Sequence, residues 1–356
     1  MQRHTLHRSL GIASGVVIGA VALAGCSAPS SDEASDTIVV STFPFGVEQF
    51  QEAIVDPFTE ATGIQVEVET GSNSDRLSQL ELSAGDPGVD VMLLSDTYVA
   101  LGQDSDLFEW IDAEDVPTID DVTELVPEGA YAGPAYTYQL NGTLYDTEAL
   151  SAEEAADWSL YGDPGLAGRV ALPDISASSG QLLVAGVGST YGDGPYDVDA
   201  ALEQLAGWAP GVLQFYTSST EVTNLLTQGE IVAANSLSGF AITLAENDDR
   251  YAFAQPASGA YMTTNHAVIP EGAPNEDAAK QFIDYLLGVE AQTAAGELVG
   301  DLPVNPDAAV PERATAVLGD VPADPIGAGY QTLDPAEVVA IRDDLVERFA
   351  REVTGG

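Results

Sequence analysis

Apolar residues recur along this chain at the spacings of alternating strands and helices. Ile38–Val40 is a short apolar run typical of a buried strand. A helix face follows in three- and four-residue steps, formed by Val47, Phe50, Ile54 and Phe58. Gly63 can end that helix, because glycine readily adopts the left-handed conformation found at helix C-termini.

The next segments continue the alternation. Polar and apolar residues alternate over 64–69, which predicts a half-exposed strand, and a helix separates it from the strand Val89–Leu94, which is apolar except for Asp90. Strands that alternate with helices indicate right-handed βαβ units and a mainly parallel sheet. Ligands bind beyond the carboxyl ends of such strands, so we expect the loops 41–46 and 95–98 at a binding edge.

The middle and the end of the chain repeat this pattern. Strands are expected at 169–172 and 231–234, a helix opens near Ser179, and a strong apolar helix face spans 278–287. Asp334, with proline next, marks the start of the last helix. About 320 residues beyond the N-terminal segment exceed what one hydrophobic core usually holds, which favours two lobes.

The first 36 residues have a different composition. Arg3 and Arg8 precede the apolar stretch Gly11–Ala24, which is shorter than the roughly 20 residues that span a bilayer and fits a signal peptide. The run that ends at Cys26, Leu-Ala-Gly-Cys, resembles a lipobox, in which the peptide is cut before the cysteine and the thiol is acylated. An ordinary secretory signal with an incidental cysteine is the alternative. Residues 27–36 are small and polar, as in a flexible tether.

Charge narrows the classes of partner. Cleavage before Cys26 removes two arginines from the formal net charge of −47 and leaves −49. Such a surface repels nucleic acid and anionic lipid headgroups. Solubility, tolerance of salt and attraction of cations are all open as reasons for the acidity. No segment after the signal is long and apolar enough to cross a membrane.

Common catalytic signatures are missing. His266 is the single histidine after the signal, no Gly-x-Ser-x-Gly elbow or His-Glu-x-x-His pair occurs, and the lone Lys280 is not in a phosphate loop. The one cysteine, Cys26, excludes an intrachain disulfide. We expect no metal and no cofactor. Paired carboxylates for glycoside hydrolysis stay open among so many acids.

Several motifs, in this order and spacing, carry a family resemblance. They are Pro-Phe-Thr-Glu-Ala-Thr-Gly-Ile at 57–64, Val-Asp-Val-Met-Leu-Leu-Ser at 89–95, Trp-Ser-Leu-Tyr at 158–161, His-Ala-Val-Ile-Pro at 266–270 and Leu-Pro-Val-Asn at 302–305. Together with the lipobox they make the chain similar to extracellular solute-binding proteins of ABC importers, and more closely to the spermidine/putrescine-binding branch with its ferric, thiamine and phosphonate relatives.

The resemblance implies an α/β fold of the periplasmic-binding-protein type. Each lobe would be a mainly parallel sheet flanked by helices, with the ligand cleft between the lobes. The expected organisation is a signal peptide at 1–25, a lipidated cysteine and tether at 26–36, lobe 1 at 37–136 and 258–310, lobe 2 at 137–257, and a C-terminal helical segment at 311–356.

The resemblance also bears on the solute. Phe43 and Phe45 stand where polyamine-binding relatives carry aromatic residues, and Ser95 is retained. A later aromatic and acidic pair of those relatives falls on Thr263 and Asn265, neither of which can pair with an ammonium group. A polyamine is therefore disfavoured, because burial of a diammonium ligand without carboxylates is costly. The adjacent tyrosines and early histidine of the ferric relatives are not found.

Other candidates come from predicted loops and helix starts. Ser178 and Ser179 can hold an anion at a helix N-terminus or simply cap the helix, and the same two interpretations apply to the run from Thr217 to Thr220. Asp96 can contact the ligand or cap a helix. Tyrosines near the segment 134–145, the strand expected to cross between the lobes, can contact the ligand or pack against that strand. The predicted ligand-binding set is Phe43, Phe45, Ser95, Asp96, Thr97, Tyr138, Ser178, Ser179, Thr217, Ser236, Tyr261 and Asn265.

The sequence therefore predicts a solute-binding protein and not an enzyme. It would be a monomer anchored by lipid at the outer face of the membrane, and it would deliver a small polar solute, polyamine-like or another small organic compound, to an ABC permease and its ATPase. Two alternatives stay open: a secreted lipoprotein hydrolase of the glycosidase kind with cleft carboxylates, and a surface protein for binding or adhesion without transport.

Overall fold

A computed structural model describes residues 37–83 and 85–355, with backbone alone at Ser219. The predicted signal peptide, Cys26 and the tether lie outside the described residues. None of the described helices combines the length and the apolar character that a membrane span needs.

The first lobe is built on the strand order β2-β1-β3-β10, continued by the first half of β5. β1 pairs in parallel with β2 and β3, whereas β10 is antiparallel to β3 and β5. These strands are β1 (Thr37–Thr42), β2 (Gln65–Thr70), β3 (Val91–Ser95), β5 (Ala135–Asp146) and β10 (Met262–Pro270), with the short β4 (Phe108–Glu109) and β11 (Leu302–Pro303) added at β10 and β5.

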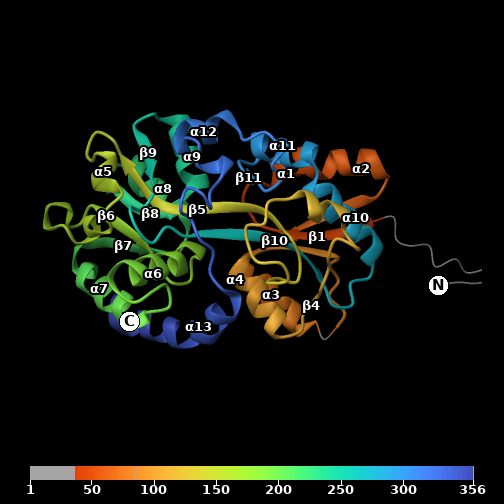
Figure 1. Ribbon diagram of the computed structural model, residues 1–356, viewed down its shortest axis with the longest axis horizontal. Coiled ribbons are helices and arrows are strands. Elements are labelled where there is room, and N and C mark those ends of the chain that lie inside the picture. Colours follow the sequence, from red (N-terminus) through yellow and green to blue (C-terminus); the bar gives the residue numbers. More distant parts are fainter. Residues whose placement is uncertain (1–36, 84, 356) are drawn as a thin grey trace, which may run out of the picture. The chain divides into compact units, whose positions relative to one another are not determined.

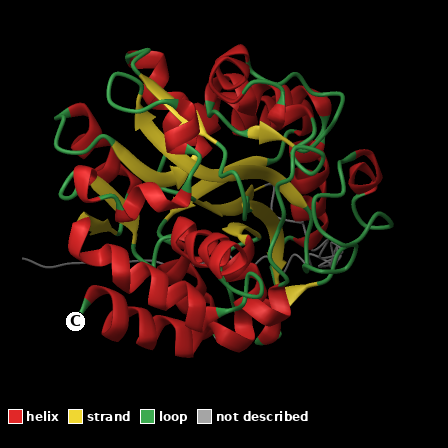
Figure 2. Ribbon diagram, turned by 60° about the vertical axis from the view of Figure 1, so that its left-hand side comes forward, coloured by secondary structure: helices red, strands yellow, loops and turns green. Residues whose placement is uncertain are grey.

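Helices flank these strands (Figure 2). The single helix expected from Val47 to Phe58 consists of three consecutive segments, the middle one a π-helix, and it ends as predicted at Gly63, which has a positive φ of 81°. The helical segments of this lobe are α1 (Val47–Phe50), η1 (Gln51–Val55), α2 (Asp56–Thr62), α3 (Asn73–Leu82), α4 (Asp96–Asp104), η2 (Pro117–Asp121), α10 (Glu276–Leu287) and α11 (Val289–Leu298).

The second lobe continues the order as β5-β8-β6-β7, with β9 on β5. β6 is parallel to β7 and β8, which confirms the expected parallel core. Its strands are β6 (Val170–Pro173), β7 (Val212–Tyr216), β8 (Ala233–Leu237) and β9 (Tyr251–Ala254). Its helices are α5 (Ala152–Ala155), η3 (Trp158–Gly162), η4 (Pro164–Leu166), α6 (Ser178–Tyr191), α7 (Val198–Trp208), η5 (Ala209–Gly211), α8 (Ser219–Thr227) and α9 (Ser238–Asn247).

Two strands connect the lobes. β5 and β10 lie side by side in the middle of Figure 1. β5 pairs with β10 up to Leu140 and with β8 from Asn141 onward, so one long strand belongs to both sheets. The chain returns through the link between β9 and β10.

The C-terminal segment packs on both lobes. Asp334 caps α13 as predicted, because its Oδ1 accepts hydrogen bonds from the backbone N–H groups of Ala336 and Glu337. Val339 packs against the apolar cluster around α3 and α4, whereas Phe349 is fully buried in the core of the second lobe. The segment comprises α12 (Glu312–Leu318), η6 (Val321–Ala323), α13 (Pro335–Phe349) and η7 (Ala350–Thr354).

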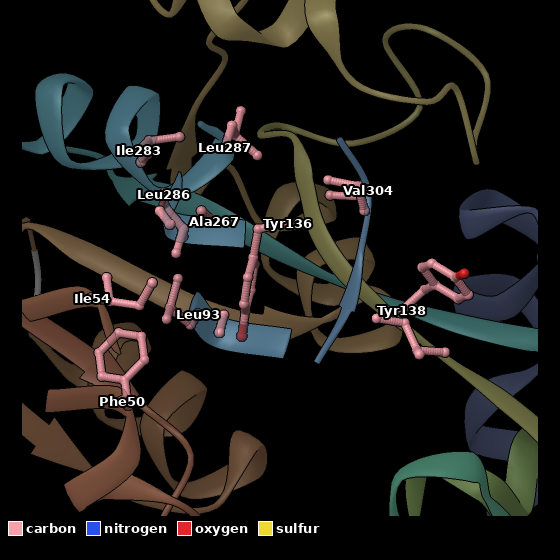
Figure 3. Packing of buried hydrophobic residues seen from close by; sticks show 14 of the residues in the cluster. Phe50, Ile54, Leu93, Tyr136, Tyr138, Ala267, Ile283, Leu286, Leu287 and Val304 are labelled. Atoms are coloured by element: carbon pink, nitrogen blue, oxygen red, sulfur yellow. The ribbon is translucent and has the colours of Figure 1, made fainter. Parts of the chain in front are cut away.

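The core of the first lobe holds the strand ends in place. Leu93 and Ala267, from adjacent strands, pack with Tyr136 and the apolar face of α10 (Figure 3). The apolar face predicted for residues 278–287 is confirmed, since Phe282, Ile283, Leu286 and Leu287 are buried. The buried apolar face of α10 supports β1 and β3. Polar residues follow the carboxyl ends of both strands.

Candidate functional site

The loops that follow the strands of the two lobes touch each other. Thr97 Oγ1, at the start of α4, donates a hydrogen bond of 3.1 Å to Oε1 of Gln181 in α6. The ring of Phe45, which is 60% exposed, lies with its centroid 6.1 Å from that of Phe240 in α9. The carboxyl ends of β1 and β3 therefore face the helix starts that follow β6 and β8.

The crossing strand β5 contributes to the same region. Gln139 Oε1 accepts hydrogen bonds from the Gly239 backbone N–H at 2.8 Å and from Ser238 Oγ at 3.3 Å. The Gln139 side chain is half-buried. It ties the start of α9 to the strand that joins the lobes, which positions Phe240.

Asp96 is buried between α4 and β10. Its Oδ1 accepts from the Thr97 backbone N–H at 2.7 Å and from Thr263 Oγ1 at 2.9 Å, and its Oδ2 accepts from the Thr264 backbone N–H at 3.1 Å. Burial raises the pKa of the Asp96 carboxyl, and these hydrogen bonds partly oppose the rise. The carboxylate is thus largely occupied by protein donors, although Asp96 belongs to the predicted site.

Arg76 brings a positive charge to the neighbouring strand end. Its guanidinium lies 5.1 Å from the ring centroid of Phe43, and the side chain is 5% exposed. Nε donates to the Gly71 carbonyl and Nη1 to the Ser41 carbonyl, at 3.1 and 3.0 Å. Burial lowers the pKa of Arg76 to about 10, so the group keeps its charge at neutral pH.

A hydrogen-bonded chain connects this charge to Ser95. Arg76 Nη2 donates to Asn73 Oδ1 at 3.0 Å, and Asn73 Nδ2 donates to Ser95 Oγ at 3.1 Å. Asn265 lies directly opposite Ser95 in the register of β10 and β3, and its side chain is half-buried. Ser95, Phe43 and Asn265 therefore gather at one strand edge, as the predicted site requires.

The hydroxyls predicted in the second lobe are used differently. Ser179 Oγ is 3.1 Å from the Tyr216 hydroxyl, which itself donates to the Asn235 carbonyl at 2.8 Å. Ser179 and Ser236 are both buried, but the Ser236 hydroxyl has no hydrogen-bond partner among the described residues, and Ser178 is half-buried at the start of α6. The interpretation of Ser178 and Ser179 as helix caps is wrong, because the N-cap of α6 is Ala177, which has no side-chain oxygen.

Thr217 stands apart from these contacts. Its backbone N–H donates to Glu221 Oε2, and the next residue, Ser218, caps α8 by accepting from the Thr220 backbone N–H. The capping interpretation of this run is confirmed at Ser218. We leave Thr217 out of the candidate site.

The two predicted tyrosines serve the joint between the lobes. The buried Tyr138 donates its hydroxyl to the Pro322 carbonyl at 2.8 Å, and Figure 3 shows its ring apart from that of Tyr136. The buried Tyr261 hydroxyl pairs with Ser189 Oγ at 2.8 Å. Both hydroxyls have protein partners, so we leave these residues out of the candidate site as well.

The single histidine of the described chain is a core residue. His266 is fully buried, with Nδ1 2.9 Å from the Gly133 carbonyl and Nε2 2.8 Å from Thr264 Oγ1. The Tyr131 ring packs on it at a tilt of 39°, with the two ring centroids 4.2 Å apart. The carbonyl fixes the proton on Nδ1, so Nε2 accepts from the threonine. Burial lowers the pKa of His266 to about 4, which keeps the ring neutral.

The carboxylates do not form a hydrolytic pair among the buried residues. In the described part of the chain Asp301 is half-buried with a desolvated carboxyl, and the two most fully buried acids are Asp90 and Asp96. They flank β3 at opposite ends, about 20 Å apart at the rise of an extended strand. Glycosidases need their two carboxyl groups within roughly 10 Å. No group of three or more metal-ligating side chains is found in 37–83 or 85–355.

A separate cavity of about 550 Å³ is lined by residues of the segment 110–135 in the first lobe. Trp110, which is 57% exposed, stands at this cavity with Asp112, Glu124 and Tyr131. None of the twelve predicted site residues lines it. It is a competing location for a ligand and supplies a control for the experiments below.

Sequence reasoning missed Asn73, Arg76, Gln139, Gln181 and Phe240. Arg76 could have been noticed, since it is one of few basic residues in an acidic chain and lies next to Leu77 on the apolar face of a helix. Asn73 follows β2 just as Phe43 follows β1 and Ser95 ends β3. Gln181 and Phe240 gave no comparable signal.

Comparisons with known proteins agree with this architecture. A family model described as bacterial extracellular solute-binding protein matches residues 53–321. The chain is 23% identical to Iron uptake protein A1 of Synechocystis sp. over 90% of its length and 91% of that protein's, and 24% identical to Spermidine/putrescine-binding periplasmic protein 1 of Haemophilus influenzae over 74% and 73%.

Solved structures give the same answer for the fold. An ABC transporter protein from Clostridium perfringens superposes with a TM-score of 0.75 at 25% identity, covering 89% of this chain and 99% of that one. The fold is the α/β fold of periplasmic binding proteins. The chain belongs to the family of bacterial extracellular solute-binding proteins, which are not enzymes, and it is the solute-binding component of an ABC importer.

Proposed function

We propose that the protein captures a small polar solute between the strand-end loops of its two lobes and passes it to a membrane permease driven by an ATPase. The observation that carries this proposal is the pair of contacts between the lobes, Thr97 to Gln181 and Phe45 to Phe240. A solute held among these side chains would touch both lobes at once, so its binding energy can favour lobe closure.

Two exposed aromatic residues on the first lobe test where the solute binds. Phe45→Ala should weaken solute binding about tenfold, the effect expected from loss of one aromatic contact. Trp110→Ala should leave affinity unchanged, because Trp110 stands at the separate cavity. Affinity is measured by titration calorimetry after a thermal-shift screen. The opposite pattern, loss with Trp110→Ala alone, would move the site to the cavity.

Lobe closure offers an independent readout. A bound solute should raise the melting temperature and lower the radius of gyration measured by small-angle X-ray scattering. If a broad panel of metabolites changes neither quantity, capture of a small solute is refuted.

We also propose that the protein is anchored to the outer face of the membrane by lipid on Cys26. Cys26→Ser should release it from the membrane fraction and abolish incorporation of radiolabelled palmitate. A variant that stays in the membrane fraction would refute the anchor.

A further inference from the structure

We infer that the solute presents an oxyanion, such as a carboxylate or phosphonate, to the Ser95 hydroxyl, and that Arg76 supplies the positive charge that selects it. The inference rests on the proposed function and specifies the chemical class of its solute. It identifies Arg76 and Asn73 as positioning residues and Ser95 as the residue that contacts the solute.

The charge on Arg76 is not neutralised within the described chain. Among residues 37–83 and 85–355, Arg76 is the one buried arginine or lysine, and no carboxylate forms an ion pair with it. Its three hydrogen bonds go to neutral oxygens, of Gly71, Ser41 and Asn73. Most other cations of the chain, among them Lys280 and Arg348, are paired with acids. A buried guanidinium without a counter-ion is costly, and an anion nearby would reduce that cost.

The hydrogen bonds run in one direction only. A guanidinium can only donate, so the oxygen of the Asn73 amide must face Arg76 and the nitrogen must face Ser95. Ser95 Oγ therefore accepts from Asn73, and its own proton is left to be donated. The chain that begins at a positive charge thus ends in a hydroxyl donor at the strand edge, where an acceptor group of the solute would fit.

The neighbouring residues agree with an acceptor on the solute. Asn265, opposite Ser95, carries an uncharged amide that can donate a second hydrogen bond. Asp96, the adjacent acid, already accepts from Thr97, Thr263 and Thr264. An ammonium group at Ser95 would meet the positive field of Arg76 and an Asp96 carboxylate that is already hydrogen-bonded, which disfavours a polyamine.

Arg76 also has a structural role, and the experiment must distinguish it from the proposed role in solute binding. Its side chain joins the end of β1 to the loop before α3 through Ser41 and Gly71, and a Cβ at Gly71 would lie 2.9 Å from the Arg76 Cγ. This role needs the guanidinium to stay in place but does not need Ser95 to be a donor. The structural role does not depend on the donor-to-acceptor direction of the hydrogen bonds from Arg76 to Ser95. Solute binding does, because it needs the Ser95 proton.

Asn73→Asp reverses that direction while keeping the fold. The new carboxylate would pair with Arg76, and an acid is favourable in the first turn of a helix, where residue 73 lies. Ser95 would then donate its proton to the introduced carboxylate and offer no donor to the solute. Ser95→Ala removes the donor directly. Ser105→Ala, at the exposed far end of α4, is the matched control.

The probes are linear compounds of three to six carbons in three matched series: carboxylates and phosphonates, diamines and triamines, and the corresponding alcohols. The full-length protein, purified in detergent, is screened by thermal shift, and binders are titrated by calorimetry. We expect oxyanions to bind, and Asn73→Asp and Ser95→Ala to weaken them about 10- to 100-fold. Ser105→Ala should bind as the wild type does, and the melting temperature of Asn73→Asp should not fall.

Each other outcome overturns a defined part of the inference. If diamines or alcohols bind as well as oxyanions, the solute class is wrong and the proposed function survives. If oxyanions bind but Asn73→Asp retains full affinity, the hydrogen bonds from Arg76 through Asn73 to Ser95 do not form the oxyanion site. If no series binds but the broad metabolite panel still yields a solute, the inference fails and the proposed function survives; if the broad panel yields none either, both fail.

Discussion

The strand ends of the two lobes differ in how their polar groups are used. In the first lobe, Arg76, Asn73 and Ser95 form a hydrogen-bonded chain that ends at the Ser95 hydroxyl, whose proton has no acceptor among the described residues. In the second lobe, Ser179 bonds to Tyr216, whose hydroxyl in turn bonds to a main-chain carbonyl, whereas the buried Ser236 hydroxyl has no hydrogen-bond partner among the described residues. Both edges are rich in hydroxyls by sequence. We expect a polar residue at a strand end to recognise a solute only if its hydrogen bonds are not satisfied within its own lobe, a condition that Ser95 and Ser236 meet.

The charges follow the same division. The buried charged side chains of this region, Arg76 and Asp96, both belong to the first lobe, whereas Ser178, Ser236 and Gln181 of the second lobe are neutral. We therefore expect the first lobe to determine which solute binds. The second lobe would mainly complete the enclosure, through Gln181 and Phe240.

The largest expected effect tests the first lobe. Asp96→Ala leaves the backbone N–H groups of Thr97 and Thr264 and the Thr263 hydroxyl without their acceptor, and each buried orphan costs about 1–3 kcal/mol. We expect a loss of about 4 kcal/mol in the free energy of unfolding, measured with urea. Asp104→Ala, at the exposed end of the same helix, should change it by less than about 0.5 kcal/mol. Equal losses for Asp96→Ala and Asp104→Ala would show that the hydrogen bonds of Asp96 do not stabilise the fold.

The buried histidine of the first lobe should give a pH dependence. Because the folded-state pKa of His266 is lowered to about 4, the unfolded chain binds a proton below about pH 6.5 that the folded chain does not. This group therefore costs stability as the pH falls from about 6.5 to about 4, by at most about 3 kcal/mol. Relative to the wild type, His266→Gln should become more stable over that window.

Titration of Asp301 changes the stability with pH in the opposite direction to that of His266, so the experiment must control for it. Burial raises its pKa to about 7, so it contributes stability at low pH that is lost as the pH rises from about 4 through 7. Asp301→Asn should remove the pH-dependent contribution of Asp301. The variant with both Asp301→Asn and His266→Gln should separate it from the contribution of His266. A wild-type curve and a His266→Gln curve that stay parallel from pH 4 to 7 would contradict the assignment of His266.

A smaller effect is expected in the second lobe. Ser179→Ala removes the donor to the Tyr216 hydroxyl, which still donates to the Asn235 carbonyl, so unfolding should cost about 1 kcal/mol less. Solute affinity should not change. A tenfold loss of affinity without a loss of stability would place Ser179 in the site and remove the contrast between the lobes.

The smallest effect concerns the bridge between the lobes. Gln181→Ala removes the hydrogen bond from Thr97, which is half-buried and worth about 0.5 kcal/mol. The population of the closed form should fall about twofold, seen as a slightly larger radius of gyration at subsaturating solute. No change in the radius would leave Phe45 and Phe240 as the contact that matters.

The sequence predicted more of the fold than of the site. Helix ends with strong local signals, at Gly63 and Asp334, were confirmed, because capping depends on neighbours in the chain. The strand expected at 231–234 instead begins at Ala233 and extends to Leu237, since pairing with β5 decides where a strand ends. Of the two interpretations of Ser178 and Ser179, the helix cap is wrong because Ala177 occupies that position.

By itself the sequence determined the alternation of strands and helices, the acidic character of the chain and the loops that follow each strand, since all of these depend on the order of neighbouring residues. The tertiary structure decided which polar side chains are already bonded. Asp96 meets Thr263 across 167 positions, Tyr138 meets Pro322 across 184, and Asn73 meets Ser95 across 22. Burial makes such partners obligatory, and partners so distant are chosen only when the whole chain has packed.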